Sequence, residues 1–292
     1  MSPTVSRRAR ARSDDGLIGG GIASRRRRLD AELVRRELVS SRARARELVE
    51  AGRVTVGGAP ATKVTRLVDP GDAILVAGDG PRFVSRGGEK LAAALDEFGV
   101  DPTGRRAVDV GSSTGGFTDC LLQAGAASVV AIDVGRHQLH ERLRADDRVA
   151  VHEQTNIRHA DVAELGGPGD LVVADLSFIS LGLVAAAIRS FVREGGDLVV
   201  LVKPQFEAGK AEADRGRGVI RDPEIWRRTL HDACTALNAA GTAIMGVMVS
   251  PITGGDGNVE FLVHCRATAA PAPLDVDELV ARCDRAVAEA AH

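Results

Sequence analysis

Residues 105–266 of this 292-residue chain alternate short apolar runs with longer segments whose apolar residues recur at helical spacing. The apolar runs predict buried strands, and the longer segments predict helices. Strands that alternate with helices in this way build a parallel sheet that is covered by helices on both faces. The pattern therefore predicts an α/β fold with a doubly wound, Rossmann-like sheet.

The predicted strands lie at residues 107–110, 129–134, 149–152, 170–176, 197–203, 243–250 and 259–266. The predicted helices lie at residues 90–98, 117–122, 181–191, 224–240 and 275–291. Residues 205–221 are rich in glycine and charge, and they predict a loop long enough to carry a function.

A glycine-rich loop, G-S-S-T-G-G at residues 111–116, follows the first predicted strand. In a doubly wound sheet this loop lies at the carboxyl end of a strand, where ligands bind. Glycine lets the backbone turn tightly and approach a ligand without a Cβ atom in the way. The loop lacks the G-x-G-x-x-G dinucleotide fingerprint, and the nearby Asp109 suits a cationic, hydroxyl-rich ligand such as S-adenosylmethionine. A tight turn that binds nothing fits the loop alone equally well.

Two more polar residues follow predicted strands and extend this candidate pocket. Asp133 stands about 20 residues beyond the loop, where a carboxylate can accept hydrogen bonds from two ribose hydroxyls. Asn156 follows the third strand and is a candidate contact of an adenine ring. Dinucleotide enzymes and S-adenosylmethionine enzymes share the ribose-binding acid, so Asp133 does not separate the two classes.

Charge is distributed unevenly, although the formal net charge is only −2. Residues 1–66 hold 16 basic and 7 acidic residues, whereas the rest of the chain holds 22 basic and 33 acidic residues. A basic head on an acidic body is typical of a nucleic-acid anchor attached to an enzyme. Residues 1–24 show no hydrophobic periodicity, and they predict a disordered tail.

The segment after this tail carries an ordered motif that ends in G-x-V-x-V. Its positions are Arg28, Leu29, Asp30, Leu33, Ser41, Arg42, Ala45, Leu48, Val49, Gly52, Val54, Val56 and Gly58. The motif resembles the small RNA-binding module named after ribosomal protein S-four, although Gly57 stands where that family often has Asn or Asp. We expect Asp30 to cap a first helix, and Ser40 or Ser41 to cap a second. The candidate RNA contacts are Arg28, Arg35, Arg36, Arg42, Arg44, Arg46, Arg53 and Lys63.

Four charged residues stand where the predicted sheet can bring them together. Asp175 and Lys203 end strands on the edge that carries the glycine loop, and Glu260 joins them if its strand is antiparallel. Lys90 can reach the same edge from its helix. The stretches SRGGEK, DVGSSTGGFTD, ADLSFISL, LVKPQFEAGK and NVEF together resemble the TlyA family, in which an S-four-type module precedes an FtsJ-like methyltransferase. The resemblance runs from about residue 27 to residue 266.

The resemblance implies a seven-stranded, S-adenosylmethionine-dependent methyltransferase with a small N-terminal α+β RNA-binding domain. It implies methylation of a ribose 2′-hydroxyl, that of a cytidine in 23S and also 16S ribosomal RNA, within ribosomal subunits. The implied catalytic residues are Lys90, Asp175, Lys203 and Glu260. The expected cofactor-binding residues are Asp109, Gly111, Ser113, Gly115, Gly116, Phe117, Asp133, Asn156 and Asp175. The expected organisation is a tail at 1–24, an RNA-binding domain at 25–78, a linker at 79–84, a methyltransferase domain at 85–268 and a C-terminal helix at 269–292.

The chemistry explains these residue types. A ribose hydroxyl is a poor nucleophile, and the methyl group of a sulfonium is a good electrophile, so the enzyme must mainly activate and align the hydroxyl. A lysine can take the hydroxyl proton only when it is uncharged, a form that burial or a neighbouring cation favours. Lys203 with Lys90 nearby meets that requirement, and Asp175 and Glu260 would orient the two lysines. Each of the four also has a purely structural interpretation, such as a surface ion pair.

Other classes of function find less support. The 4 cysteines are scattered without zinc or disulfide spacing, and the transfer reaction needs no metal, so we expect none. A dinucleotide-dependent oxidoreductase would need the fingerprint that the loop lacks. A membrane-active hemolysin, a name that some family members carry, would need a signal peptide or a large apolar face. A ribosome-binding protein without activity stays an alternative. We expect a cytoplasmic monomer.

Overall fold

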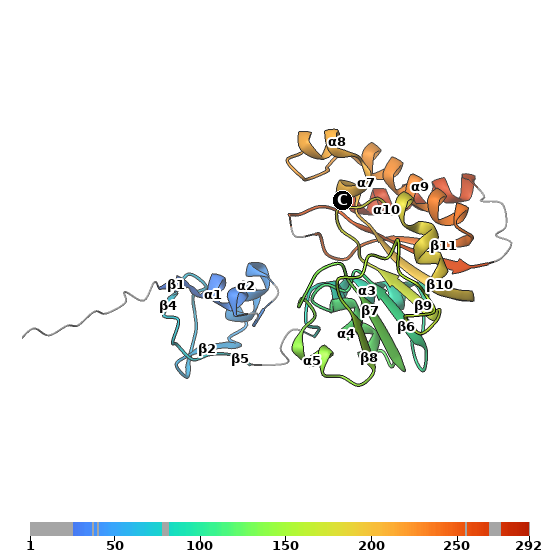
Figure 1. The fold of residues 1–292 in the computed structure, drawn as a ribbon. Coiled ribbons are helices and arrows are strands. Elements are labelled where there is room, and N and C mark those ends of the chain that lie inside the picture. Colours follow the sequence, from blue (N-terminus) through green and yellow to red (C-terminus); the bar gives the residue numbers. More distant parts are fainter. Residues whose placement is uncertain are drawn as a thin grey trace, which may run out of the picture. The chain divides into compact units, whose positions relative to one another are not determined.

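The computed structural model describes residues 26–36, 38–39, 41–77, 82–254, 256–268 and 276–291. The chain divides into two compact units, of which the first runs to Gly80 and the second starts at Pro81 (Figure 1). The tail predicted at residues 1–24 lies outside the described residues, and so does the part of the predicted linker before Arg82.

The first unit consists of two helices and short strands around a small apolar core. Its elements are β1 (Arg27–Arg28), α1 (Leu29–Arg35), α2 (Arg42–Glu50), β2 (Val54–Val56), β3 (Ala59–Pro60), β4 (Leu67–Val68) and β5 (Ile74–Val76). Strand β1 pairs with β4, and β2 lies between β3 and β5, all antiparallel. Leu29, Leu33, Ala45 and Val54 are completely buried between the helices and β2.

The helix caps of this unit follow only part of the expectation. Ser41 caps α2, because its hydroxyl accepts a hydrogen bond from the Arg44 amide at 3.1 Å. The expectation that Asp30 caps α1 is wrong, because Asp30 lies inside the helix and the N-cap residue is Arg28. The Asp30 carboxylate instead accepts hydrogen bonds from the Arg28 guanidinium at 2.8 and 3.1 Å. The Asp30 carboxylate therefore pairs with a neighbouring arginine and does not act as the helix cap that its position in the sequence predicts.

The second unit contains the large sheet. Its helices are α3 (Gly87–Phe98), α4 (Gly116–Gln123), α5 (Glu141–Arg144), the 3₁₀ helix η1 (Leu181–Leu183), α6 (Ala185–Ser190), α7 (Pro204–Glu207), α8 (Lys210–Arg215), α9 (Pro223–Ala239) and α10 (Val276–Ala291). Its strands are β6 (Arg106–Val110), β7 (Ser128–Ile132), β8 (Val149–His152), β9 (Gly169–Ala174), β10 (Val192–Val202), β11 (Thr242–Val249) and β12 (Phe261–Ala267).

The seven strands lie in the order β11-β12-β10-β9-β6-β7-β8. Neighbours from β10 to β8 pair in parallel, whereas β12 is antiparallel to both β10 and β11. The chain winds outward from β6 through β7 to β8 and then returns to β9 on the other side of β6. Ligands of such sheets bind at this change of direction, outside the carboxyl ends of the strands. The predicted seven-stranded α/β fold is confirmed.

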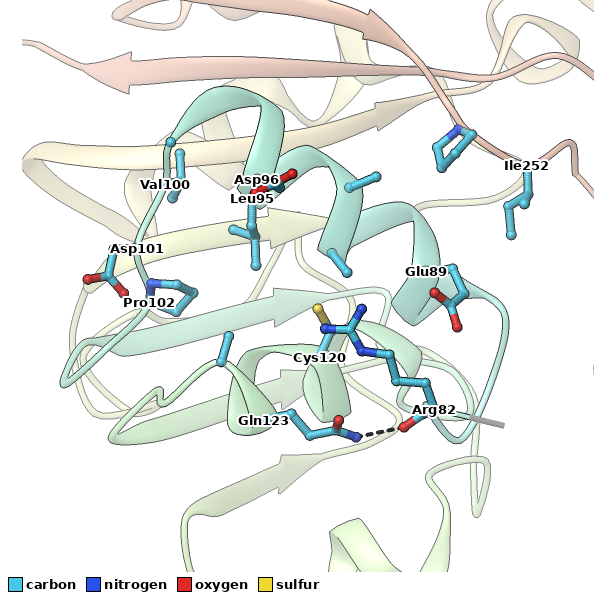
Figure 2. Close-up of a pocket in the computed structure, with 15 residues that line it drawn as sticks. Arg82, Glu89, Leu95, Asp96, Val100, Asp101, Pro102, Cys120, Gln123 and Ile252 are labelled. Carbon is cyan, nitrogen blue, oxygen red and sulfur yellow. Dashed lines mark hydrogen bonds between the residues drawn. The ribbon is translucent and has the colours of Figure 1, made fainter. Parts of the chain in front are cut away.

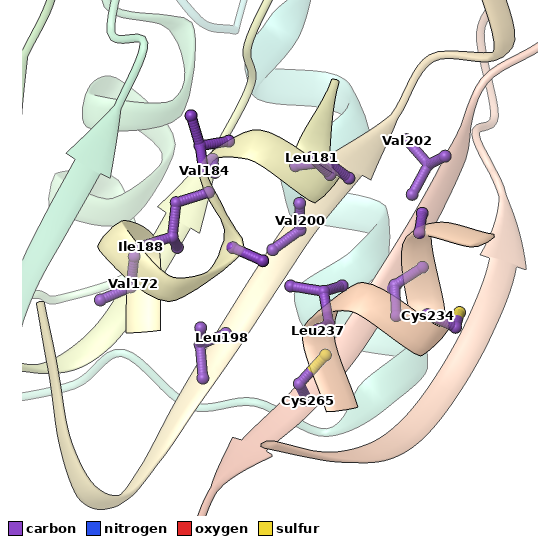
Figure 3. Close-up of a cluster of buried hydrophobic side chains, with 14 of the residues drawn as sticks. Val172, Leu181, Val184, Ile188, Leu198, Val200, Val202, Cys234, Leu237 and Cys265 are labelled. Atoms are coloured by element: carbon purple, nitrogen blue, oxygen red, sulfur yellow. The ribbon is translucent and has the colours of Figure 1, made fainter. Parts of the chain in front are cut away.

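Alternate residues of the central strands pack into two separate cores, one on each face of the sheet. Helices α3 and α4 cover one face with Leu91, Leu95, Phe117 and Leu121 among others. Helices α6, α9 and α10 cover the other face, where Figure 3 shows apolar side chains of β9 and β10 meeting Leu237 of α9. Because side chains alternate along a strand and both faces are buried, the strands read as continuous apolar runs.

The sequence predicts a glycine-rich loop at residues 205–221. That prediction is wrong for about half of the segment, which is helical. Helix α7 starts at Pro204, where proline costs no hydrogen bond because the first amides of a helix have no partner. Helix α8 follows after Gly209, which has a φ of 86°. The glycines thus separate short helices, and only residues 216–222 form a loop.

One carboxylate lies inside the second unit without a cation beside it. Asp109 of β6 is fully buried, and its Oδ2 atom accepts a hydrogen bond from the Thr118 hydroxyl at 2.6 Å. Its other oxygen has no hydrogen-bond partner among the described residues. Burial, assisted by the negative charge of Asp175, raises the pKa of Asp109 to about 7.

Replacing Asp109 by Asn should remove a pH-dependent loss of stability. Between pH 4 and pH 7 the unfolded chain releases this proton while the folded chain retains it, so stability falls with rising pH by up to about 4 kcal/mol. Asp109→Asn stays neutral and can still accept the Thr118 hydrogen bond. We expect its free energy of unfolding to exceed that of the wild type at pH 8, and the two to converge toward pH 4.

Denaturant unfolding followed by the fluorescence of Trp226, the single tryptophan of the chain, measures this difference in the second unit. Asp147→Asn serves as the control, because it removes an exposed carboxylate and should give no pH-dependent difference. An Asp109→Asn protein that is no more stable than the wild type at pH 8 would contradict the assignment of a costly buried charge.

Candidate active site

Functional side chains gather at the carboxyl edge of the large sheet. The turn that starts at Gly111 follows β6, Asp133 follows β7, Asp175 follows β9 and Lys203 follows β10. Glu260 directly precedes β12, and because β12 is antiparallel to β10, Glu260 lies at the same edge. The strand pattern of the sequence predicts this arrangement.

The glycine loop lies against the end of β9. Gly111 has a φ of 84°, and a Cβ atom there would stand 2.5 Å from the carbonyl oxygen of Asp175. Gly116 is closed in by the turn before α3, because its Cβ would stand 2.3 Å from the Ser85 hydroxyl oxygen. Gly115 serves packing instead, since its Cβ would stand 2.3 Å from the Leu143 side chain. Side chains at these positions would therefore push the loop away from its neighbours.

A cavity of about 300 Å³ opens between this loop, the start of α3 and the ends of β9 and β10. Its lining residues are Ser85, Arg86, Gly87, Lys90, Gly111, Ser112, Ser113, Thr114, Gly116, Phe117, Asp175, Ser177 and Lys203. The cavity thus brings together seven of the predicted site residues. The predicted residues that do not line it are Asp109, Gly115, Asp133, Asn156 and Glu260.

Two nearly buried lysines face this cavity, and each is paired with a carboxylate. Lys203 Nζ lies 2.5 Å from Asp175 Oδ1 and donates a hydrogen bond to Ser177 Oγ at 3.0 Å. The contact with Asp175 is an ion pair without hydrogen-bond alignment, because Oδ1 has no aligned donor. Lys90 of α3 pairs with Glu260, which is 3% exposed. The two lysines and Asp175 therefore line one small space, and Glu260 pairs with Lys90 without lining it.

Asp133 and Asn156 differ in how their oxygens are used. The Asp133 carboxylate accepts hydrogen bonds from the amides of Ser113 at 2.8 Å and Gly135 at 2.6 Å. It is thus fixed to the glycine loop, and each oxygen keeps a second lone pair for a ligand. Asn156 is exposed, and its Oδ1 accepts a hydrogen bond from the Arg158 amide at 3.0 Å. No contact among the described residues supports a role for Asn156 in the cavity.

The sequence reasoning did not single out several polar residues of the cavity. Ser85 and Arg86 belong to the S-R-G-G-E-K stretch, and Ser112 and Thr114 belong to the glycine loop. Their places in these two motifs could have identified them as candidate site residues. Ser177 supports Lys203 and could have been found as the second residue after Asp175.

Two phenylalanines beside the cavity were also missed. The Phe178 ring is 89% exposed, and its backbone has a φ of 64°, which is costly for a residue with a large side chain. The ring centroid lies 4.8 Å from that of Phe206, and the Phe206 ring lies 5.9 Å from Lys203 Nζ. The Phe206 ring therefore stands next to the paired lysine, and the exposed Phe178 packs against that ring.

The predicted RNA contacts of the first unit fall into two groups. Hydrogen bonds within the unit are formed by Arg28, Arg35, Arg36 and Arg53. The Arg36 side chain makes several of them, to the carbonyl oxygens of Asp72 and Pro70 and to the Glu32 carboxylate. The Arg35 and Arg36 guanidinium groups lower the pKa of Glu32 to about 2. The other group consists of Arg42, Arg44, Arg46 and Lys63, which are exposed, as Arg28, Arg35 and Arg53 also are, and of which Arg44 pairs with Glu47.

A larger cavity of about 980 Å³ lies between α3, α4 and the turn at Pro251 (Figure 2). Its walls are mostly apolar, with Glu89, Asp96 and Asp101 at its rim. None of the predicted site residues lines it. Its size alone therefore does not make it the candidate site.

The described ranges show two absences that bear on the function. None of their helices combines the length and apolar character that crossing a membrane requires. No three or more His, Cys, Asp or Glu side chains in these ranges gather in a way that could hold a metal ion.

Comparison with known proteins assigns a family. A model of the FtsJ-like methyltransferase family matches residues 83–267, and a model of the S4 domain matches residues 27–74. The chain is 45% identical over 267 residues to the 16S/23S rRNA (cytidine-2'-O)-methyltransferase TlyA of Mycobacterium tuberculosis, a match that covers 91% of this chain and 99% of that protein.

Some relatives carry the name hemolysin. The chain is 37% identical over 238 residues to Hemolysin A of Brachyspira hyodysenteriae, covering 81% of this chain and 98% of that protein. A solved structure from Streptococcus thermophilus, described as a hemolysin, has a TM-score of 0.69 and 37% identity and covers 92% of this chain and 99% of its own. The resemblance inferred from the motifs is confirmed: the chain belongs to the FtsJ-like methyltransferase family and, within it, to the TlyA proteins, in which an S4 domain precedes the methyltransferase domain.

Proposed function

We propose that this protein transfers a methyl group from S-adenosylmethionine to the ribose 2′-oxygen of a cytidine in 23S and 16S ribosomal RNA within ribosomal subunits. The observation that carries the proposal is the pair of buried Lys-carboxylate contacts, Lys203 with Asp175 and Lys90 with Glu260, beside a glycine-lined cavity. The printed names of the relatives support the substrate. We propose that the reaction takes place in the cytoplasm, where ribosomal subunits are found.

The residues around the cavity fit S-adenosylmethionine. Gly111 and Gly116 line the cavity at the two ends of the glycine loop, and Ser112 and Thr114 offer hydroxyl groups. Asp133 is fixed beside this loop with free lone pairs, as ribose hydroxyls require. When bound, S-adenosylmethionine supplies an electrophilic methyl group on a sulfonium.

The charged residues would act on the hydroxyl that receives the methyl group. Lys203 takes the proton of the 2′-hydroxyl at Nζ, while Asp175 and Ser177 hold that amine in position. Lys203 must be uncharged at that moment, and the Lys90 ammonium on the same cavity opposes a second positive charge. Glu260 holds Lys90 against the sheet. Alignment of the hydroxyl with the methyl group supplies much of the rate enhancement.

The first unit would hold the RNA. Phosphate contacts by Lys and Arg dominate affinity for nucleic acid, and the exposed side chains of Arg42, Arg46 and Lys63 are available for them. The excess of acidic residues in the rest of the chain would repel phosphate away from the active site. A module that contacts the backbone in this way recognises the shape of a folded RNA more than its base sequence.

Asp133→Ala should weaken S-adenosylmethionine binding by about 1–3 kcal/mol, because ribose hydroxyls would lose their partner in a partly buried site. Isothermal calorimetry with the full-length protein measures this loss. Asp146→Ala, which removes a carboxylate paired with Arg148, is the control and should bind normally. Tighter binding of NAD than of S-adenosylmethionine by the wild type would overturn the cofactor assignment.

Lys203→Ala should abolish methyl transfer and leave cofactor affinity nearly unchanged, because the lysine acts on the hydroxyl. Lys203→Arg separates two roles, since arginine retains the positive charge but cannot give up its proton at neutral pH. We expect it to be inactive as well. Lys90→Ala and Glu260→Ala should be strongly impaired. Single-turnover methylation of ribosomal subunits measures each rate, and near-normal turnover by Lys203→Ala would refute the catalytic role.

Reversing Arg42 and Arg46 to Glu should weaken RNA binding and reduce its salt dependence by about 1–2 in the slope of log K against log salt, because each lost phosphate contact removes a released counterion. Cofactor affinity should not change. Arg148 and Arg193 reversed to Glu give the same change of net charge on the second unit and serve as the control. Equal salt slopes for the two double variants would show that the first unit is not the RNA anchor.

A further inference from the structure

A partly buried carboxylate beside the active site has no role in the reaction described above. Glu207 is the last residue of α7, the short helix that begins immediately after Lys203. Lys203 is the N-cap residue of this helix, and the amides of Phe206 and Glu207 both donate to the Lys203 carbonyl oxygen, at 2.9 and 3.3 Å. The backbone of Lys203 and the position of Glu207 are therefore set by the same helical turn.

Both oxygens of Glu207 bind the segment on the other side of the site. We call residues 175–180, between β9 and η1, the β9–η1 loop. Glu207 Oε2 accepts a hydrogen bond from the Ser180 hydroxyl at 2.7 Å, and Oε1 accepts one from the Leu181 amide at 2.9 Å. Burial raises the pKa of Glu207 even though these two hydrogen bonds lower it. Glu207 is half-buried, and the partial loss of water around a carboxylate has a cost against which this bridge is maintained.

The same two segments meet at two other points, and both are at the reacting centre. Lys203 Nζ contacts Asp175 and Ser177, and the Phe206 ring packs on the Phe178 ring. Glu207 is thus the outermost of three connections between α7 and the β9–η1 loop. It is the one farthest along the chain from Lys203 Nζ, so it can act on the reaction only through the loop that it holds.

The β9–η1 loop needs such a restraint. Phe178 has a φ of 64°, and a non-glycine residue retains this backbone conformation only when the surrounding structure holds it. The Phe178 ring is 89% exposed, so burial of the ring contributes little to holding it. The two hydrogen bonds of Glu207 fix the backbone just after Phe178, at the start of η1.

We propose that Glu207 is a positioning residue, which holds the β9–η1 loop against α7 so that Asp175, Ser177 and Phe178 keep their places around the Lys203 amine. The kinetic consequence rests on the proposed function, because it concerns the transfer of the methyl group. A displacement of about 1 Å of a reacting group can cost roughly 100-fold in rate, so loss of this restraint should lower kcat.

Three variants test the proposal in the full-length protein. Glu207→Ala removes both hydrogen bonds, and we expect kcat to fall at least about 10-fold, with the Kd of S-adenosylmethionine and the KM of ribosomal subunits within about twofold of the wild type. Glu207→Gln retains both, because the amide oxygen can accept from Leu181 while the amide nitrogen donates to Ser180. It should retain kcat within about threefold. Ser180→Ala removes the hydrogen bond to Glu207 Oε2 together with the N-cap hydrogen bond that Ser180 Oγ accepts from the Gly182 amide at 3.2 Å, and it should give an intermediate kcat.

Ser190→Ala is the matched control. The Ser190 hydroxyl donates to the Ala187 carbonyl oxygen at 2.7 Å, at the far end of α6 and away from the cavity. This variant loses the hydrogen bond of a serine hydroxyl outside the site, and it should leave kcat unchanged. A fall in kcat that follows general destabilisation would appear in both serine variants.

Hydrogen–deuterium exchange of peptides that cover residues 176–184 provides a readout that does not depend on methylation. Exchange there should be faster in Glu207→Ala and Ser180→Ala than in the wild type, Glu207→Gln and Ser190→Ala. Unchanged exchange would overturn the restraint, and faster exchange with unchanged kcat would overturn the positioning role. If Glu207→Ala does not fold, an unchanged kcat in Ser180→Ala, which loses the contact with Glu207, would still overturn the positioning role. A wild-type protein that methylates no ribosomal RNA would refute the proposed function, and the exchange result would still test the restraint.

Discussion

The close approach of the glycine loop to the end of β9 is the constraint on which the rest of the site depends. Only a residue without a Cβ atom can occupy position 111, because that atom would stand 2.5 Å from the Asp175 carbonyl oxygen. The contact brings the turn after β6 beside the turn after β9. It also sets the width of the cavity, because the Lys203 amine lies on the other side of Asp175. If the two turns were farther apart, Lys203 and the glycine loop would no longer line the same cavity.

Charge at this edge is balanced by contacts between distant parts of the chain. Lys90 and Glu260 are 170 residues apart, and their ion pair connects the first helix of the second unit to the last strand of its sheet. Removing two charges from water is expensive, and buried pairs of this kind contribute little to net stability. The stability of the unit comes instead from the apolar cores on the two faces of the sheet. The ion pairs are better understood as devices that hold functional amines in place.

The two units divide the work on an RNA substrate. In the first unit, arginines that face inward hold its helices and turns together, as Arg36 does with Glu32 and the 69–72 turn. Arginines on the exposed side of α2 remain available to phosphate. Beyond residue 66 acidic residues outnumber basic ones, 33 to 22. Under the proposed function, a polyanion would therefore be attracted mainly by the first unit.

The sequence by itself determined the order of strands and helices, because burial on both faces leaves continuous apolar runs that differ from amphipathic helices. It also placed Asp175, Lys203 and Glu260 at one edge, since the ends of parallel strands and the start of an antiparallel one coincide in space. The motifs determined the family. Their signal is strong because five separate stretches agree, although no single one of them is specific.

Tertiary structure alone decided how individual side chains are used. Asp30 becomes a partner of Arg28 instead of a helix cap, and Gly115 meets Leu143 instead of a ligand, because both outcomes depend on neighbours that folding supplies. The helices within residues 204–215 were missed because each is only a few residues long and is defined by what it packs against. The connection from Glu207 to Ser180 and Leu181 joins residues 27 and 26 positions apart. No local pattern encodes that distance, since a glutamate after an aromatic residue looks the same whether its carboxylate reaches solvent or a neighbouring loop.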